Sequence, residues 1–290
     1  MKRAYVAGAL NSEHATGYLQ NVSKMLDTAE QLRLLGVAPF KPAEDLLSGI
    51  KFGYYEYDDV FDPSQAWLDV SDFVYLTPGW EDSPGTRREI ERASRKGIPV
   101  FMDIDEVKQF LKPVIVCIVG ESGSGKSLMA EWFEKLFHYN LIVSYTTRPM
   151  RSPNEKGHTF IDDAMFDTFS HDDMIAYTKF GDYRYCCLKQ DVQDYNTYVI
   201  DENGLQMLRE KYSDTYHIYA IRVYAKPVKG LLTDFASSER ILRDKGRFTM
   251  SDNEFDFVFK NSYDLSKLIN FVQVTHNAVH SDFISKCYYV

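Results

Sequence analysis

The chain has 290 residues, of which 44% are hydrophobic and 26% charged, and its formal net charge is -9. This is an ordinary globular composition, and the length allows two domains. The negative balance argues against a protein that binds nucleic acid independently of sequence, because such proteins need a surplus of cations. We therefore expect no direct nucleic-acid partner, although a few local cations and backbone amides are enough to bind a nucleotide.

The cysteines and the hydropathy of the sequence indicate which kind of protein this is. The four cysteines include no C-x-x-C pair and lie at Cys117, Cys186, Cys187 and Cys287, so they suggest neither a zinc site nor a disulfide framework. The basic start Met1-Lys2-Arg3 leads into no long apolar run, and no segment has the length of a membrane span. The sequence predicts a soluble, cytoplasmic protein without a membrane partner. A homo-oligomer formed through the first domain is compatible with it.

The first part of the chain alternates short apolar runs with helical patterns. The spacing predicts strands over residues 2–9, 37–40, 72–76 and 98–102, and helices over residues 21–35, 64–70 and 87–96. Residues 53–62, which are polar and rich in tyrosine, are expected to form a loop. Strands that alternate with helices indicate a Rossmann-like parallel sheet, an α/β fold.

Three motifs in this part resemble the superfamily of nucleoside 2-deoxyribosyltransferases and deoxynucleoside-monophosphate N-glycosidases, over roughly residues 1–110. They are Tyr5-Val6-Ala7-Gly8, Trp67-Leu68-x-x-Ser71-Asp72-Phe73-Val74 and Gly79-Trp80-Glu81-Asp82-Ser83-Pro84-Gly85-Thr86-Arg87-Arg88-Glu89. The resemblance implies that Glu89 is the nucleophile at the deoxyribose anomeric carbon, a role that suits a carboxylate. It also implies a nucleotide site formed by Tyr5, Gly8, Ser83, Gly85 and Glu89, with Ser83 marking members that accept a 5′-monophosphate.

The chain departs from this superfamily at two positions. Ser64 stands where the family carries the aspartate that handles the proton, with Asp62 nearby, and Arg87 stands where the family often has glycine. Without that second carboxylate, protonation of the leaving base has no assigned donor. Hydrolysis, transfer of deoxyribose between bases, and a catalytically idle nucleotide-binding domain all stay open. Ser83 favours a phosphorylated substrate and so argues against the transferase.

A domain boundary is predicted at about residue 112. Residues 103–111 form a short charged helical pattern, and Pro113 in Lys112-Pro113 cannot continue it. We therefore expect a first domain over residues 1–112 and a second over residues 113–290.

The second domain opens on a phosphate-binding motif. An apolar, β-branched run over residues 114–119 leads into Gly120-Glu121-Ser122-Gly123-Ser124-Gly125-Lys126-Ser127, and a helical pattern follows over residues 128–137. The motif fits G-x-x-x-x-G-K-[ST], whose glycines let backbone amides wrap a triphosphate. A nucleoside triphosphate is therefore expected on Gly120, Ser122, Gly123, Ser124, Gly125, Lys126 and Ser127, and the arginine pair described next makes ATP the expected donor. Lys126 would reach the β- and γ-phosphates, and the hydroxyl of Ser127 would bind Mg²⁺.

A pair of arginines follows the next predicted strand, at residues 141–147. Arg148 and Arg151 are spaced so that both guanidinium groups can fork onto one phosphate. The P-loop in the same domain is a first phosphate-binding motif, and the arginine pair is a second. Two such motifs indicate that the domain binds both a phosphoryl donor and a phosphoryl acceptor.

Residues 113–275 resemble the guanylate kinase family. The shared motifs are the P-loop, Ser144-Tyr145-Thr146-Thr147-Arg148-Pro149-Met150-Arg151, Gly181-Asp182-Tyr183-Arg184-Tyr185, residues 198–204 and residues 238–245. The resemblance implies a P-loop kinase fold with NMP-binding and lid subdomains. It implies that the acceptor monophosphate is held by Ser144, Arg148, Arg151 and Tyr185, that Asp201 lies at the acceptor base, and that Arg240 and Arg243 are lid arginines that act with Lys126 in catalysis.

The sequence differs from this family at positions that bind the acceptor nucleotide. Ala176 stands at the position of the guanine-reading glutamate, His158 replaces a phosphate-binding tyrosine, and Val199 replaces an acidic residue. Cys186 and Cys187 replace small residues after the hairpin tyrosine. We expect a deoxynucleoside monophosphate kinase whose acceptor base is modified or is not guanine. The alternative is a non-catalytic interaction module, but such modules tend to lose the phosphate loop that this chain keeps.

The remaining patterns complete the second domain. Residues 215–225 and 256–261 are expected as strands and residues 265–279 as a closing helix. His276 and His280 lie at i, i+4 without a third ligand, which is more typical of a surface feature than of a metal site. Taken together, the two resemblances predict a bifunctional enzyme of deoxynucleotide metabolism.

Overall fold

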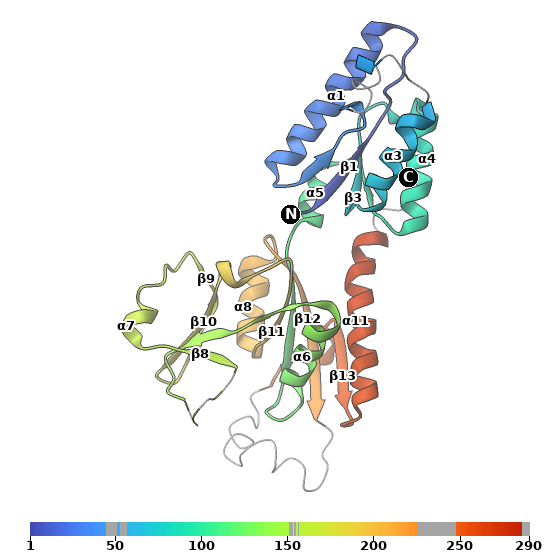
Figure 1. Ribbon diagram of the computed structural model, residues 1–290. Coiled ribbons are helices and arrows are strands. Elements are labelled where there is room, and N and C mark those ends of the chain that lie inside the picture. Colours follow the sequence, from blue (N-terminus) through green and yellow to red (C-terminus); the bar gives the residue numbers. More distant parts are fainter. Residues whose placement is uncertain are drawn as a thin grey trace. The chain divides into compact units, whose positions relative to one another are not determined.

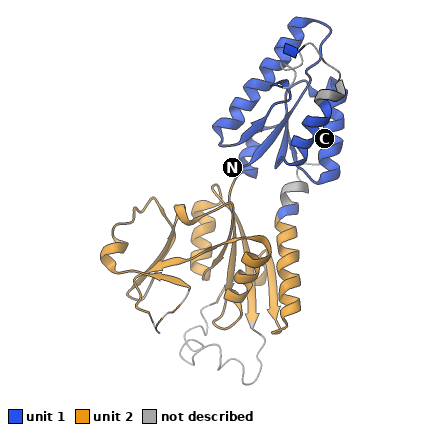
Figure 2. Ribbon diagram, in the orientation of Figure 1, with its two compact units in different colours: residues 1–111, 280–290 blue, residues 112–279 orange. Residues whose placement is uncertain are grey.

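The computed structural model describes residues 1–44, 51–52, 57–150, 153, 155, 157–225 and 248–285. The chain divides into two compact units, shown in different colours in Figure 2. Unit 1 comprises Met1–Leu111 with His280–Val290, and unit 2 comprises Lys112–Val279. The predicted α/β class is confirmed, because both units are built on parallel sheets flanked by helices (Figure 1).

Unit 1 contains a four-stranded parallel sheet in the order β2-β1-β3-β4. Its strands are β1 (Arg3–Ala7), β2 (Ala38–Phe40), β3 (Phe73–Leu76) and β4 (Val100–Phe101). The helices are α1 (Ala15–Leu34), α3 (Tyr57–Asp69), α4 (Pro84–Lys96) and α5 (Ile104–Phe110), with the 3-10 turn η1 (Trp80–Asp82). Alternate residues of β1 serve the two faces of the sheet. Ala4 and Val6 pack in one buried cluster with α1 and α5, and Tyr5 and Ala7 in another with α3 and α4.

Several predicted boundaries in unit 1 were wrong. Helix α1 begins at Ala15 rather than at residue 21, and Tyr57–Asp69 is helical although residues 53–62 were expected to form a loop. Residues 53–56 lie outside the described residues. Helix α4 starts three residues before the predicted Arg87, because the Ser83 hydroxyl caps it by accepting from the Thr86 amide at 3.2 Å.

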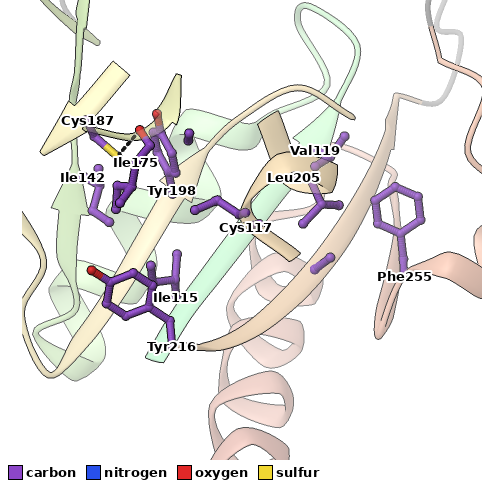
Figure 3. Packing of buried hydrophobic residues seen from close by; sticks show 13 residues of the cluster. Ile115, Cys117, Val119, Ile142, Ile175, Cys187, Tyr198, Leu205, Tyr216 and Phe255 are labelled. Carbon is purple, nitrogen blue, oxygen red and sulfur yellow. Dashed lines mark hydrogen bonds between the residues drawn. The ribbon is translucent and has the colours of Figure 1, made fainter. Parts of the chain in front are cut away.

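Unit 2 is centred on a five-stranded parallel sheet in the order β13-β12-β5-β11-β6. The central strand β5 (Val114–Gly120) is buried at every residue, as expected for a parallel strand covered on both faces. Its neighbours are β11 (Tyr195–Val199) and β12 (His217–Ala225), and the edge strands are β6 (Asn140–Ile142) and β13 (Phe257–Asn261). Ile115, Cys117 and Val119 of β5 share a buried cluster with Leu205 of α8 (Glu202–Tyr212) (Figure 3).

A second sheet of unit 2 has the order β8-β7-β10-β9. Its strands are β7 (Ser144–Thr146), β8 (His158–Phe160), β9 (Met174–Phe180) and β10 (Tyr183–Leu188). The single strand predicted over residues 141–147 is therefore wrong, since β6 and β7 belong to different sheets. The other elements are α6 (Lys126–Phe137), α7 (Asp163–Phe166), η2 (Lys189–Asp191), η3 (Asp252–Glu254) and α11 (Leu265–Ser285).

Candidate functional site

The phosphate-binding loop of unit 2 joins the carboxyl end of β5 to α6. A Cβ atom at Gly120 would lie 2.2 Å from the carbonyl oxygen of Val223, so only glycine fits beside β12. Gly123 and Gly125 have φ angles of 79° and 97°, in the left-handed region that favours glycine. The turn predicted from the motif is therefore present. Each of these three positions requires glycine, either because a side chain would clash or because the backbone is left-handed.

Polar groups of this loop suit a phosphate chain. Lys126 Nζ donates to the carbonyl oxygens of Gly120 and Glu121, at 2.7 Å each. Ser124 Oγ is buried and has no hydrogen-bond partner among the described residues. Ser127 is exposed in the first turn of α6, where its hydroxyl is available to a cation held by the phosphates. A lysine, a helix N-terminus and an unused buried hydroxyl form a donor set that fits the phosphates of ATP.

Asn261 supports the loop, and sequence reasoning missed it. Its Nδ2 donates to the Ser124 carbonyl oxygen at 2.8 Å, and its Oδ1 accepts from the Tyr263 amide at 2.8 Å. A Cβ atom at Gly125 would lie 2.5 Å from that Nδ2, so glycine at this position also makes room for Asn261. The available signal was a polar residue at the carboxyl end of the last predicted strand, where parallel strands place site residues.

The second sheet brings predicted acceptor-binding residues onto one face. Ser144 is paired with His158, and Thr146 is paired with both Phe160 and Tyr185, so these side chains share a face. The His158 ring lies 5.7 Å from the Tyr185 ring, and the Arg148 guanidinium lies 5.1 Å from the Phe160 ring centroid. Ser144, His158 and Tyr185 therefore share a face with Phe160, against whose ring the Arg148 guanidinium lies.

Arg148 forms an ion pair with a carboxylate of the same unit. The side chain is buried, and its guanidinium forms a two-pronged ion pair with Glu155, with N···O distances of 2.8 and 3.2 Å. Such fork geometry is the one that an arginine also offers to a phosphate. An acceptor phosphate that uses Arg148 must therefore displace or join Glu155. The predicted Arg151, Arg240 and Arg243 lie outside the described residues.

Residues expected at the acceptor base are buried or structurally engaged. Asp201 caps α8, with its Oδ1 accepting from the Gly204 amide at 2.9 Å. Ala176 is 3% exposed and has a φ of 51°, and it packs in the main core of the unit. Cys187 Sγ donates to the Ile175 carbonyl oxygen at 3.5 Å (Figure 3). Burial raises the pKa of the Cys186 thiol to about 12, which makes it a poor nucleophile.

Unit 1 holds a pocket of about 680 Å³ between the loop after β1, one face of α1 and the N-terminus of α4. Four of the predicted N-terminal site residues line it, namely Gly8, Ser83, Gly85 and Glu89. At Gly8 a Cβ atom would lie 1.8 Å from Thr77 Oγ1, so the chain needs glycine to enter the pocket loop. The N-terminus of α4 thus faces the same space as the predicted nucleophile.

Tyr5, the fifth predicted residue, lies behind the pocket and contacts Glu89. Its phenol donates a 2.6 Å hydrogen bond to Glu89 Oε1. Tyr5 is fully buried and Glu89 is 8% exposed. Burial raises the pKa of Glu89 to about 7, and the hydrogen bond from Tyr5 opposes that rise. Glu89 is therefore a buried, protonatable carboxyl on a pocket wall rather than a solvated residue at the start of a helix.

Two further polar residues, Ser64 and Asp82, line the pocket together with Glu89. Ser64 lines the pocket, but its hydroxyl donates to the Phe61 carbonyl oxygen at 2.8 Å. Asp82 also lines the pocket, and sequence reasoning did not select it. The guanidinium of Arg87 donates to the Glu81 carbonyl oxygen at 2.6 and 3.1 Å, so it holds η1 in place. This contact gives Arg87 a structural role.

Other candidate features are absent from the part of the chain that the structure describes. No group of three or more histidine, cysteine, aspartate or glutamate side chains could hold a metal ion there. His276 instead stacks on Phe137, with ring centroids 3.6 Å apart and an interplanar angle of 7°. No helix within the described ranges is long and apolar enough to cross a membrane.

Comparisons with known proteins leave the residues of these sites untested. A family described as "Domain of unknown function (DUF4406)" matches residues 2–102. No curated protein matches the chain. Among solved structures, the crystal structure of guanylate kinase from Anaplasma phagocytophilum is similar at 17% identity and a TM-score of 0.42, over 59% of this chain and 87% of that chain. A likeness at this level carries no conclusion about activity.

Proposed function

We propose that unit 2 transfers the γ-phosphoryl group of ATP to a deoxynucleoside monophosphate. The observation that carries the proposal is the loop from Gly120 to Ser127, with Lys126 on its carbonyl oxygens and Ser124 Oγ buried without a partner among the described residues. In the same unit, the face that carries Ser144, Arg148 and Tyr185 supplies a second phosphate-binding surface. Two phosphate sites in one unit suit a donor and an acceptor.

Catalysis in this proposal consists of positioning and charge neutralisation. Lys126 exchanges its loop carbonyl partners for the β- and γ-phosphates, and Arg148 exchanges Glu155 for the acceptor phosphate. Mg²⁺, which Ser127 would hold together with the phosphates and water, supplies further charge neutralisation. We propose that three further cations contact the transferring phosphoryl group and the acceptor phosphate, namely Arg151, Arg240 and Arg243.

The acceptor is proposed to carry a base other than unmodified guanine. Ala176 is buried in the core, so this position offers no carboxylate to the N1 and N2 hydrogens of guanine. Asp201 keeps one carboxylate oxygen on the Gly204 amide. The base is therefore read by groups other than the glutamate of the guanylate kinase family.

A panel of common and modified deoxynucleoside monophosphates, assayed for ADP formation with ATP and Mg²⁺, tests this proposal. We expect turnover of at least one acceptor, and its loss in Lys126→Ala. The proposal fails if no monophosphate is turned over and Lys126→Ala leaves ATP binding unchanged. That second result would favour the alternative of a non-catalytic interaction module.

A second activity is proposed for unit 1, because Glu89 and Tyr5 form a buried pair on the wall of its pocket. The Glu89 carboxylate attacks C1′ of a deoxynucleoside monophosphate, the bond from C1′ to the base nitrogen breaks, and a glycosyl ester forms. The base takes a proton from water. Water then hydrolyses the ester, which releases deoxyribose 5-phosphate and regenerates Glu89.

The same panel, scored for free base, tests this second activity. Glu89→Gln keeps the shape of the side chain but removes the nucleophile, so we expect base release to stop while ADP formation continues. Formation of a new deoxynucleoside monophosphate when a second free base is added would identify the transferase alternative. If no monophosphate loses its base, unit 1 is a binding domain without catalysis.

A further inference from the structure

Two cationic side chains of the unit 1 pocket have no assigned role. Lys24 from α1 and Arg88 from α4 both line the pocket. Neither forms an ion pair with a carboxylate among the described residues, although Asp82 and Glu89 line the same space. Both side chains are exposed, so their charges are available to a ligand. Cations directed into a pocket without a protein partner suit an anionic ligand.

Lys24 belongs to a polar face of α1 that is turned to the pocket. Gly17, Gln20, Asn21 and Lys24 follow helical spacing and all line the pocket, whereas Met25, Ala29 and Leu32 pack in the core. Lys24 Nζ lies 4.0 Å from the place where a Cβ of Gly79 would stand. Gly79 precedes η1, and Ser83 follows it. Lys24 therefore lies at the opposite end of this 3-10 turn from the Ser83 cap.

The N-terminus of α4 provides hydrogen-bond donors for one phosphate group. Thr86, in its first turn, lines the pocket and is 1% exposed, and its Oγ1 is buried without a hydrogen-bond partner among the described residues. Together with the backbone amides of the first turn and Arg88, this hydroxyl can receive a phosphate group. A phosphate bound there leaves Lys24, beyond η1, without an anionic partner.

We propose that the unit 1 pocket binds nucleoside diphosphates, with one phosphate at the N-terminus of α4 and the next paired with Lys24. The inference rests on the proposed nucleotide site of unit 1 but not on its hydrolytic activity. A nucleoside diphosphate is also the class of product that the proposed reaction of unit 2 forms. The product of one unit would then occupy the pocket of the other and compete with the monophosphate there.

Hydrogen exchange measured by mass spectrometry tests this in the full chain, because peptides over residues 8–24 and 79–89 report on the unit 1 pocket alone. The probes are phosphate, pyrophosphate, and the mono- and diphosphates of the four common deoxynucleosides, titrated into Glu89→Gln so that no ligand is consumed. We expect diphosphates to protect these peptides at about tenfold lower concentration than monophosphates, the factor of one charge-assisted hydrogen bond. Pyrophosphate should likewise protect these peptides at a lower concentration than phosphate does.

Adding Lys24→Gln should abolish this preference and leave protection by monophosphates nearly unchanged. Arg95→Gln is the matched control, since Arg95 is exposed in the last turn of α4 and does not line the pocket. Equal protection by mono- and diphosphates overturns the inference while leaving the monophosphate site standing. Absence of protection by every probe overturns both. Protection by diphosphates without base release from any monophosphate supports the inference and rejects the hydrolase.

Discussion

The phenol of Tyr5 donates a 2.6 Å hydrogen bond to Glu89 Oε1, although 84 positions separate the two residues in the sequence. Tyr5 lies in the central part of β1, and Glu89 lies in the second turn of α4. The contact joins the sheet to the helix at the wall of the pocket. Burial and this one hydrogen bond set the ionisation of the carboxyl, so the stability of unit 1 and the base release proposed for it should both depend on this contact.

Glu89 should make the stability of unit 1 fall as pH rises. Burial raises its pKa from the ordinary 4.5 to about 7, so the folded state binds the proton more tightly than the unfolded state. This contribution is complete below pH 4.5 and is lost as pH rises through about 7, and it is on the order of 3 kcal/mol. Urea titrations at pH 5 and pH 8, followed by Trp67 and Trp80 fluorescence in a Trp132→Phe background, measure it. Glu89→Gln should remove the pH dependence, and a dependence of unchanged size in that variant would contradict the assignment.

Tyr5→Phe should shift the pH profile of base release to higher pH. Tyr5 stabilises the ionised carboxylate, and its loss raises the pKa of Glu89 further above the present value. Because the nucleophile must be ionised, the rate at pH 6 should fall more than the rate at pH 9. The Phe40 ring lies tilted by 31° against the Tyr5 ring, with centroids 5.6 Å apart, and Phe40→Leu changes this packing without removing the hydrogen bond. A shift of equal size in Phe40→Leu would mean that packing rather than the phenol causes the effect.

Short-range patterns were sufficient for much of the fold and of the P-loop. The glycines and Lys126 lie within eight consecutive residues, and their geometry follows from local backbone preferences. The parallel sheets follow from the alternation of apolar runs with helical patterns. Pro63 shows where local rules fail, because it lies inside α3 although the surrounding polar residues suggested a loop. The helix is held by tertiary packing of residues such as Leu68, which propensity does not include.

Contacts between distant residues could not be predicted in the same way. Asn261 supports the Ser124 carbonyl from 137 positions away, and nothing in the local sequence names that partner. Lys24 was read only as part of a helix, since its pocket arises where α1 meets the loop after β3. At Val143 the chain passes from one sheet to another, a change that a continuous apolar pattern conceals.

Lys126→Ala should abolish ADP formation, with a loss of at least about a hundredfold, since one electrostatic contact to the transferring group contributes this much. The lysine is only partly buried and lies outside the packed core, so its removal should leave the fold intact. Lys135→Ala removes the same charge from the far end of α6 and serves as the control. Initial rates at saturating ATP and acceptor check the result. A loss of similar size in Lys135→Ala would show that the charge of the helix, not the contact, is responsible.

Asn261→Ala should weaken ATP binding by loosening the loop. It leaves the buried Ser124 carbonyl without its donor, at a cost of about 1–3 kcal/mol. Asn261→Asp separates the two bonds, because a carboxylate still accepts from the Tyr263 amide but cannot donate to Ser124. Both variants should raise the KM for ATP while the KM for the acceptor changes little. Equal effects on the two constants would point to general unfolding of unit 2.

Arg222→Met should destabilise unit 2 more than any of the preceding changes. Arg222 and Glu202 form a buried ion pair at 2.5 Å, and the guanidinium lies within 5.4 Å of the ring centroids of Tyr224, Phe248 and Phe255. The other carboxylate oxygen of Glu202 accepts from the amides of Thr249 and Met250. Removing the arginine leaves a buried carboxylate without its counter-charge, a loss of about 3–5 kcal/mol.

The double variant Arg222→Met with Glu202→Gln should recover much of this loss, because the glutamine oxygen still accepts from both amides but carries no charge. Urea titrations followed by Trp132 fluorescence, in a background where Trp67 and Trp80 are phenylalanine, report on unit 2 alone. The single variant Glu202→Gln completes the cycle. If the double variant is no more stable than Arg222→Met, the cation stabilises the unit through its three aromatic contacts, and the charge of Glu202 is not what makes it necessary.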